Sequence, residues 1–126
     1  MKNMPTILIA DRNPYVRRFL QRELANAGYE VLMAESGRQV LFWIDRHTAL
    51  DLAIVDLDLP DMEAEALFEH LRQRVPVIPI VVHSHPDDQL RCLSGGGVYF
   101  VEKKGNSIEG IIKMVGNILA AGAPAV

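Results

Sequence analysis

Four polar side chains that could act together in phosphoryl transfer stand within two residues after short apolar runs of the sequence. Asp11 and Asp56 could share a hard divalent cation such as Mg²⁺, because close carboxylates repel each other until a cation or a proton relieves them. Ser84 could orient an oxygen of a group carried on Asp56, and Lys103 could neutralise its charge. Taken singly, an Asp or a Ser is an ordinary loop residue, and Lys103 beside Lys104 is an ordinary solvated pair. Their combination favours the chemical interpretation.

The chain alternates short apolar runs with stretches of helical periodicity, and this alternation decides where those side chains would lie. The apolar runs predict strands over residues 6–10, 29–34, 52–55, 78–82 and 98–101. The helical spacing of apolar residues predicts helices over residues 14–27, 37–46, 64–74, 86–93 and 107–121. Pro14 suits a first helical turn, and Gly28 suits a helix end.

Strands that are apolar throughout and separated by helices predict an α/β fold with a parallel sheet covered on both faces. With right-handed crossovers, the chain becomes a (βα)5 doubly wound five-stranded parallel sheet. Sites in such sheets form at the carboxyl ends of the strands, beside the switch in strand order. Asp11 would end the first strand and Asp56 the third, so we expect the two carboxylates to lie together if these strands are neighbours.

Composition and charge narrow the class of protein. The 126 residues are 49% apolar and 23% charged, which predicts one globular domain over residues 1–121 and a tail or linker start over residues 122–126. The net charge of −3, without a basic stripe, argues against direct binding of nucleic acid. The sequence has no long apolar segment, which argues against a membrane span. Cys92 is the single cysteine, which excludes an internal disulfide and suits a cytoplasmic protein.

Four segments, in order, resemble the receiver domains of response regulators in two-component signal transduction. They are Ile7-Leu8-Ile9-Ala10-Asp11, Asp56-Leu57-Asp58-Leu59-Pro60-Asp61-Met62, Pro79-Ile80-Val81-Val82-His83-Ser84 and Gly96-Gly97-Val98-Tyr99-Phe100-Val101-Glu102-Lys103. Each segment is weak evidence alone, whereas four with suitable spacing over residues 6–120 are specific. The resemblance is to chemotaxis-regulator-like domains and implies a flavodoxin-like sheet with strand order 2-1-3-4-5.

The resemblance also implies a role for each residue of the predicted pocket. Asp56 would accept a phosphoryl group from a phosphohistidine on a histidine kinase or a histidine phosphotransfer protein. Asp11, Asp56 and the backbone carbonyl of Asp58 would hold Mg²⁺. Ser84 and Lys103 would contact the phosphoryl oxygens.

Beyond the pocket, the resemblance implies a switch in a phosphorelay. Phe100 falls on the aromatic switch position of the fifth strand. The output would be an unknown further domain or target protein, and a homodimer is one form of assembly that the family suggests. Such a domain is a signalling phosphoacceptor rather than an enzyme, apart from self-phosphorylation by small donors and self-dephosphorylation.

Two residues of the predicted pocket depart from the family's pattern. Arg12 stands where a second acid usually follows the first, which could weaken Mg²⁺ binding and phosphorylation. Alternatively, Arg12 could pair with Asp56 and imitate the cation, Asp58 could supply a compensating carboxylate, or Arg12 could simply point to solvent. His85 replaces a small residue and would either crowd the opening or add a titratable donor. His83 would point the same way along an extended strand, and either histidine could equally be uninvolved.

Three further interpretations remain beside a phosphorylation-competent receiver. Arg12 and His85 fit a pseudo-receiver that keeps the fold and acts as a protein-binding or dimerisation module without phosphorylation. The run Val55-Asp56-Leu57-Asp58 matches the nucleophile motif of haloacid-dehalogenase-like phosphatases, although that motif ends the first strand of a larger fold. A flavodoxin-like cofactor domain would need a Ser/Thr-Gly-rich phosphate loop after the first strand, and the sequence has none there.

Overall fold

The computed structural model describes residues 4–46, 49–73, 77–85 and 97–121, and within them strands and helices alternate along most of the chain. The strands are β1 (Thr6–Ala10), β2 (Glu30–Ala34), β3 (Leu50–Val55), β4 (Ile80–Ser84) and β5 (Val98–Glu102). The helices are α1 (Pro14–Asn26), α2 (Gly37–Arg46), α3 (Ala64–Gln73) and α4 (Ser107–Ala120). No helix in the described part of the chain is both long enough and apolar enough to cross a membrane.

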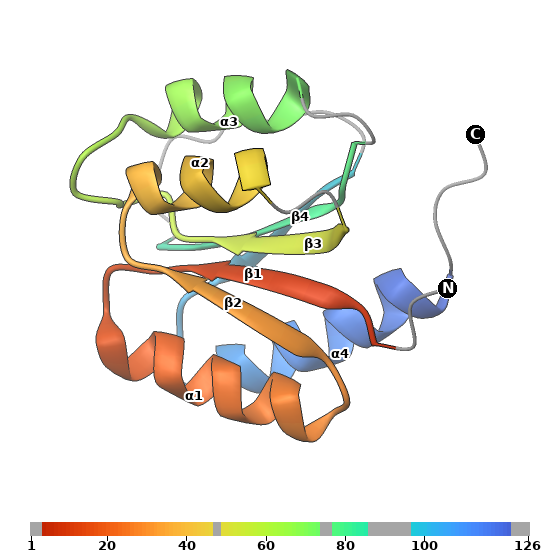
Figure 1. The fold of residues 1–126 in the computed structure, drawn as a ribbon. Coiled ribbons are helices and arrows are strands. Elements are labelled where there is room, and N and C mark those ends of the chain that lie inside the picture. The colour runs from red at the N-terminus through yellow and green to blue at the C-terminus, as the bar shows by residue number, and fades with distance from the viewer. Residues whose placement is uncertain (1–3, 47–48, 74–76, 86–96, 122–126) are drawn as a thin grey trace.

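The five strands form one parallel sheet in the order β2-β1-β3-β4-β5, which confirms the predicted fold class and strand order. Helices α1 and α4 cover one face of this sheet, and α2 and α3 cover the other (Figure 1). The strand order reverses beside β1, so β1 and β3 are neighbours in the sheet although α1, β2 and α2 separate them in sequence. Their carboxyl ends therefore meet at one point of the sheet edge, where doubly wound folds place their sites.

Alternate residues of each central strand enter two separate cores. Ile7 and Ile9 of β1 pack with α1 and α4, whereas Leu8 and Ala10 pack with α2 and α3. Because both faces are covered, all five residues of β1 and of β4 are buried. The edge strands β2 and β5 are only partly covered in the described structure. Burial on both faces explains why the central strands read as continuous apolar runs.

The fourth strand is displaced from its prediction. The apolar run predicted residues 78–82, but β4 spans Ile80–Ser84. Pro79 has no N–H to donate to the ladder, and its carbonyl accepts from Ala53 N at 3.1 Å, so regular pairing begins one residue later. His83 and Ser84 therefore belong to the sheet instead of following it. The helix predicted over residues 86–93 lies outside the described residues.

The loop after β3 is fastened to the start of α2. The Asp61 carboxylate accepts hydrogen bonds from Gly37 N at 2.7 Å and from Arg38 N at 3.1 Å. These two N–H groups have no partner within the helix, so Asp61 acts as its N-cap from a distant part of the chain. The same N–H groups lower the pKa of Asp61. Met62 packs against Gly37 so closely that a Cβ there would lie 2.7 Å from Met62 Cβ.

Candidate functional site

Asp11 and Asp56 lie side by side at the carboxyl edge of the sheet, directly after β1 and β3. Asp11 N donates to Ala34 O at 3.1 Å, which extends the pairing of β1 with β2. Asp56 N donates to Ala10 O at 2.8 Å, which extends the pairing of β3 with β1. Both residues are only 2% exposed. The expectation that neighbouring strands bring the two carboxylates together is confirmed.

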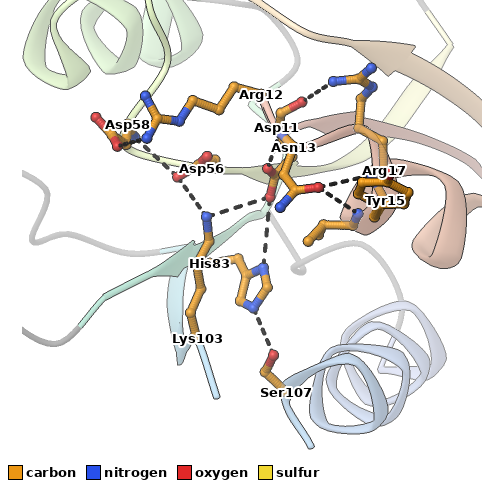
Figure 2. Close-up of polar contacts among 11 residues, drawn as sticks. Asp11, Arg12, Asn13, Tyr15, Arg17, Asp56, Asp58, His83, Lys103 and Ser107 are labelled. Carbon is orange, nitrogen blue, oxygen red and sulfur yellow. Dashed lines mark hydrogen bonds and ion pairs between the residues drawn. The ribbon is translucent and has the colours of Figure 1, made fainter. Parts of the chain in front are cut away.

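Lys103, the first residue after β5, reaches across this edge to both acids. Its Nζ lies 3.1 Å from Asp56 Oδ1 and 3.7 Å from Asp11 Oδ2 (Figure 2). Lys103 N donates to Ser84 O at 2.8 Å, which extends the β4–β5 pairing and aims the side chain at the acids. The ammonium group is therefore an internal counter-ion for two buried carboxylates.

The loop between β1 and α1 fixes the position of Asp11. Asn13 N donates to Asp11 Oδ1 at 2.9 Å, and Arg17 Nη1 donates to Asp11 O at 2.6 Å. The Asn13 side chain caps α1 by accepting from Tyr15 N. Burial raises the pKa of Asp11, nearby Asp56 adds to the rise, and the Asn13 N–H and Lys103 oppose it. A nearby cation would relieve this unfavourable charge.

The donors present fit an oxygen-liganded divalent cation. Asp56 Oδ2 is buried and has no hydrogen-bond partner among the described residues, although carboxylate oxygens are ordinarily paired. The described residues contain no cluster of three or more acidic, histidine or cysteine side chains that could hold a metal. Mg²⁺ commonly takes one or two carboxylates and keeps several waters, so Asp11 and Asp56 suffice as side-chain ligands.

Arg12 pairs with Asp58 rather than with Asp56. Its Nη2 lies 3.0 Å from Asp58 Oδ2, and the two side chains are 57% and 61% exposed (Figure 2). Asp58 N in turn donates to Asp56 Oδ1 at 3.1 Å. Arg12 therefore does not imitate a cation on Asp56. It points toward solvent and forms an exposed ion pair with Asp58 at the rim of the pocket. Such an exposed pair holds the side chain only weakly.

The remaining predicted site residues lie at the carboxyl end of β4 and within β5. Ser84 is the last residue of β4 and is buried, and it stands opposite Glu102 in the sheet. His85 follows β4 and is exposed. Phe100 lies in the middle of β5, opposite Val82, and its side chain is 42% exposed.

His83 and Ser107 form a buried polar contact behind Asp11 that the sequence did not reveal. His83 Nε2 lies 2.9 Å from Ser107 Oγ, and Nδ1 lies 4.0 Å from Asp11 Oδ2 (Figure 2). Burial, assisted by Lys103, lowers the pKa of His83 to about 4. The atoms follow the order of a Ser-His-Asp triad, but 4.0 Å exceeds a hydrogen bond and the Ser107 hydroxyl is buried. A histidine within an apolar strand was the only available signal.

A model of a known protein family matches most of this chain. The family model of the response regulator receiver domain matches residues 7–115. The virulence transcriptional regulatory protein PhoP of Salmonella typhimurium is 30% identical over 103 residues, which cover 79% of this chain and 46% of PhoP. The chain thus spans about half the length of the curated relative that it matches.

Solved structures agree in fold. The chemotaxis response regulator CheY4 of Vibrio cholerae superposes with a TM-score of 0.80 at 23% identity, covering 93% of this chain and 100% of that one. The response regulator TrrA of Thermotoga maritima, solved in complex with Mg²⁺ and BeF, gives a TM-score of 0.76 at 26% identity, covering 92% of this chain and 100% of that one.

Proposed function

The chain belongs to the family of response regulator receiver domains, and from that premise we propose that Asp56 accepts a phosphoryl group from a phosphohistidine. The observation that carries the proposal is the buried Asp56 carboxylate, with Lys103 Nζ at 3.1 Å and Asp11 beside it. A carboxylate with an adjacent ammonium group and a second acid for a cation is what phosphoryl transfer to an aspartate needs.

In the transfer, an oxygen of Asp56 attacks phosphorus, and the bond between phosphorus and the donor imidazole nitrogen breaks. The departing imidazole recovers a proton from solvent, and Asp56 becomes an acyl phosphate. Lys103 stabilises negative charge on the phosphoryl oxygens, and the Ser84 hydroxyl orients one of them. Attack of water on phosphorus releases inorganic phosphate and restores the carboxylate, so the group acts as a reversible switch. Phe100 in β5 is the proposed aromatic residue that follows the phosphorylation state.

Asp11, Asp56 and the backbone carbonyl of Asp58 would hold Mg²⁺, which supplies charge neutralisation for the transferred group. Arg12 places a fixed positive charge beside Asp58, 3.0 Å from its carboxylate. This charge opposes cation binding by Coulomb repulsion, so we expect weaker Mg²⁺ affinity than two adjacent acids would give.

The proposed partners are a histidine kinase or a histidine phosphotransfer protein, together with an output domain or target protein. The match covers only 46% of PhoP, so this chain gives no direct information on an output domain, and the output is proposed from the family alone. Residues 1–121 would form the receiver, residues 122–126 a tail or linker start, and the cytoplasm is the proposed location. A homodimer is the proposed assembly, without direct contact to nucleic acid or membrane.

One observation favours a second candidate function. The Arg12–Asp58 ion pair occupies the rim where a second acid would assist the cation. A pocket whose negative charge is already partly balanced by its own arginine and lysine fits a phosphorylation-independent module that binds or dimerises through the same fold. Self-phosphorylation by a small donor distinguishes this candidate from the first.

The test is the intact mass of the protein after incubation with phosphoramidate, in Mg²⁺ and in EDTA. We expect a phosphoryl adduct in Mg²⁺ that is absent from Asp56→Asn. Asp45→Asn, which alters an exposed acid on α2, is the matched control and should retain the adduct. A folded protein without any adduct would support the phosphorylation-independent module. Turnover of a generic phosphate ester would instead revive the phosphatase interpretation.

A further inference from the structure

His83 is a buried polar residue that phosphoryl transfer to Asp56 does not use. It follows Val81 by two residues in β4, so its side chain points to the same face, into the core beneath α1 and α4. Its Nδ1 is buried without a hydrogen-bond partner among the described residues. Because unpaired buried polar atoms are costly, an imidazole in this core calls for a physical reason.

The surroundings of His83 select one of its two neutral tautomers. If Nε2 donated to Ser107 Oγ, the lone pair of Nδ1 would face the Asp11 carboxylate 4.0 Å away, and the two would repel. If Ser107 donates to Nε2, the proton lies on Nδ1 and the N–H dipole points toward Asp11 Oδ2. The second arrangement is electrostatically favourable, and the partner of one ring nitrogen sets the state of the other. The lowered pKa of His83 agrees with a neutral ring.

His83 therefore stands between the acidic pocket and the C-terminal helix. On one side lies Asp11, which shares Lys103 with Asp56. On the other side lies Ser107, the first residue of α4. The line Lys103–Asp11–His83–Ser107 runs through buried or nearly buried side chains, where electrostatic interactions are screened less than at the surface.

We propose that His83 is a positioning residue that couples the charge around Asp11 to the first turn of α4, through the Nδ1–H tautomer held by the Ser107 hydroxyl. The functional meaning of this coupling rests on the proposed phosphorylation of Asp56. Phosphorylation draws Lys103 toward the phosphoryl oxygens and away from Asp11. The Nδ1–H dipole then becomes a more important partner for the Asp11 carboxylate, and movement of the ring pulls on Ser107.

The first test reads the tautomer of His83 directly by ¹⁵N NMR of the imidazole nitrogens. We expect the Nδ1–H form in the wild-type protein and a loss of that preference in Asp11→Asn, because the Asp11 carboxylate disfavours the other tautomer. Asp45→Asn, which alters an exposed acid on α2, is the matched control and should keep the Nδ1–H form. An Nε2–H ring in the wild-type protein would overturn the proposal. This result is independent of whether the protein can be phosphorylated.

The second test is a double-mutant cycle that changes the charge at Asp11 without phosphorylation. Asp11→Asn should shift the amide resonances of Glu109 and Gly110 in α4, and the shift should be about twofold smaller or less in the Ser107→Ala background. Ser107→Thr keeps a hydroxyl and should restore the full shift. Equal shifts in both backgrounds would show that the coupling does not run through Ser107.

The same amides are then followed after incubation with phosphoramidate and Mg²⁺, with the intact mass of each sample measured in parallel. An adduct accompanied by α4 shifts that Ser107→Ala reduces supports the proposal, and an adduct with unchanged shifts in Ser107→Ala contradicts it. A wild-type protein that forms no adduct refutes the proposed phosphorylation, while the tautomer and the double-mutant cycle still decide whether His83 couples the two sites.

Discussion

Asp11 is a buried acid whose raised pKa marks an unfavourable charge, since burial and the neighbouring Asp56 both disfavour ionisation. Asp11→Asn keeps the shape of the side chain and removes that charge. We expect it to raise the free energy of unfolding at pH 7 by about 1 kcal/mol, within the range of single stabilising changes. Urea unfolding of the metal-free protein measures this, with Asp45→Asn as control. A loss of stability would mean that the pair with Lys103 outweighs the burial penalty.

Arg12 provides a direct test of what the departure from the family does. Arg12→Asp replaces a positive charge near Asp58 with an acid, so Mg²⁺ should bind about tenfold more tightly, equivalent to about 1.4 kcal/mol. Arg18→Asp makes the same charge change at an exposed position on α1 and should alter the affinity much less. Calorimetric titration with Mg²⁺ compares the three proteins. Equal affinities for Arg12→Asp and Arg18→Asp would show that Arg12 has no specific effect.

His83 predicts a pH dependence of stability. Its pKa falls from the usual 6.5 to about 4, chiefly through burial and also through Lys103 and His85, while Asp56 opposes the shift. Between pH 6.5 and 4, His83 is protonated in the unfolded chain but not in the folded protein. Stability that is present above pH 6.5 is therefore lost as the pH falls toward 4.

By pH 5 the loss that His83 causes should reach about 2 kcal/mol. It should be missing from His83→Val and present in His70→Gln, which alters an exposed histidine on α3. Unfolding in urea at several pH values, in EDTA, gives the comparison. The same decline in His83→Val as in the wild-type protein would rule out His83 as its source.

Individual pocket residues differ in how far the sequence could predict them. Asp11 and Asp56 directly follow apolar runs and Lys103 follows one after a single intervening residue, and strand order alone then brings them to one edge. The partner of Arg12 was not predictable, because a long flexible side chain can reach either Asp56 or Asp58. The contact between His83 and Ser107 joins β4 to α4, and it depends on the exact packing of the helix on the sheet, which apolar periodicity does not specify.

Among the elements, the start of α2 and the loop after β3 are expected to act as one unit, because Asp61 and Met62 contact Gly37. Gly37→Ala would place a Cβ 2.7 Å from Met62 Cβ, so the loop that carries Asp58 must shift. We expect a loss of about 1–3 kcal/mol in the free energy of unfolding, as for other overpacked sites.

Gly116→Ala in α4 is the matched control, because no atom lies within 4 Å of its added Cβ. There the change should stabilise the protein by up to about 1 kcal/mol, since alanine is the better helix former. Thermal or urea unfolding of both variants measures the difference. If Gly37→Ala were as stable as Gly116→Ala, the close contact with Met62 would not constrain the loop.

The elements themselves were largely predictable, and the errors have a local cause. Covered strands leave continuous apolar runs and amphipathic helices leave periodic ones, and α1 and α2 begin at the predicted residues. The displaced β4 arose because Ile78 and Pro79 are apolar yet precede the regular ladder, while His83 and Ser84 are polar yet paired within it. At this point of the chain the polar side chains mark the functional site and not the end of the strand. The extent of β4 is determined by backbone hydrogen bonding, which side-chain polarity does not reveal.

At the scale of the whole molecule, two covered faces leave the carboxyl edge of the sheet as the place where polar groups converge. Residues distant in sequence meet there because strand order reverses beside β1. This arrangement followed from the α/β alternation and the resemblance to receiver domains. The coupling between the pocket and α4 did not, since it requires two buried polar side chains on different elements to meet.

Asp56 is the proposed carrier of the phosphoryl group, and reductive trapping tests this role most directly. Borohydride converts an aspartyl phosphate to homoserine, so the protein is treated with phosphoramidate and Mg²⁺, reduced, digested and sequenced by mass spectrometry. We predict homoserine at position 56, in the wild-type protein and in the Asp45→Asn control. Homoserine at position 11 or 58 instead, or none in a folded protein, would contradict this role of Asp56.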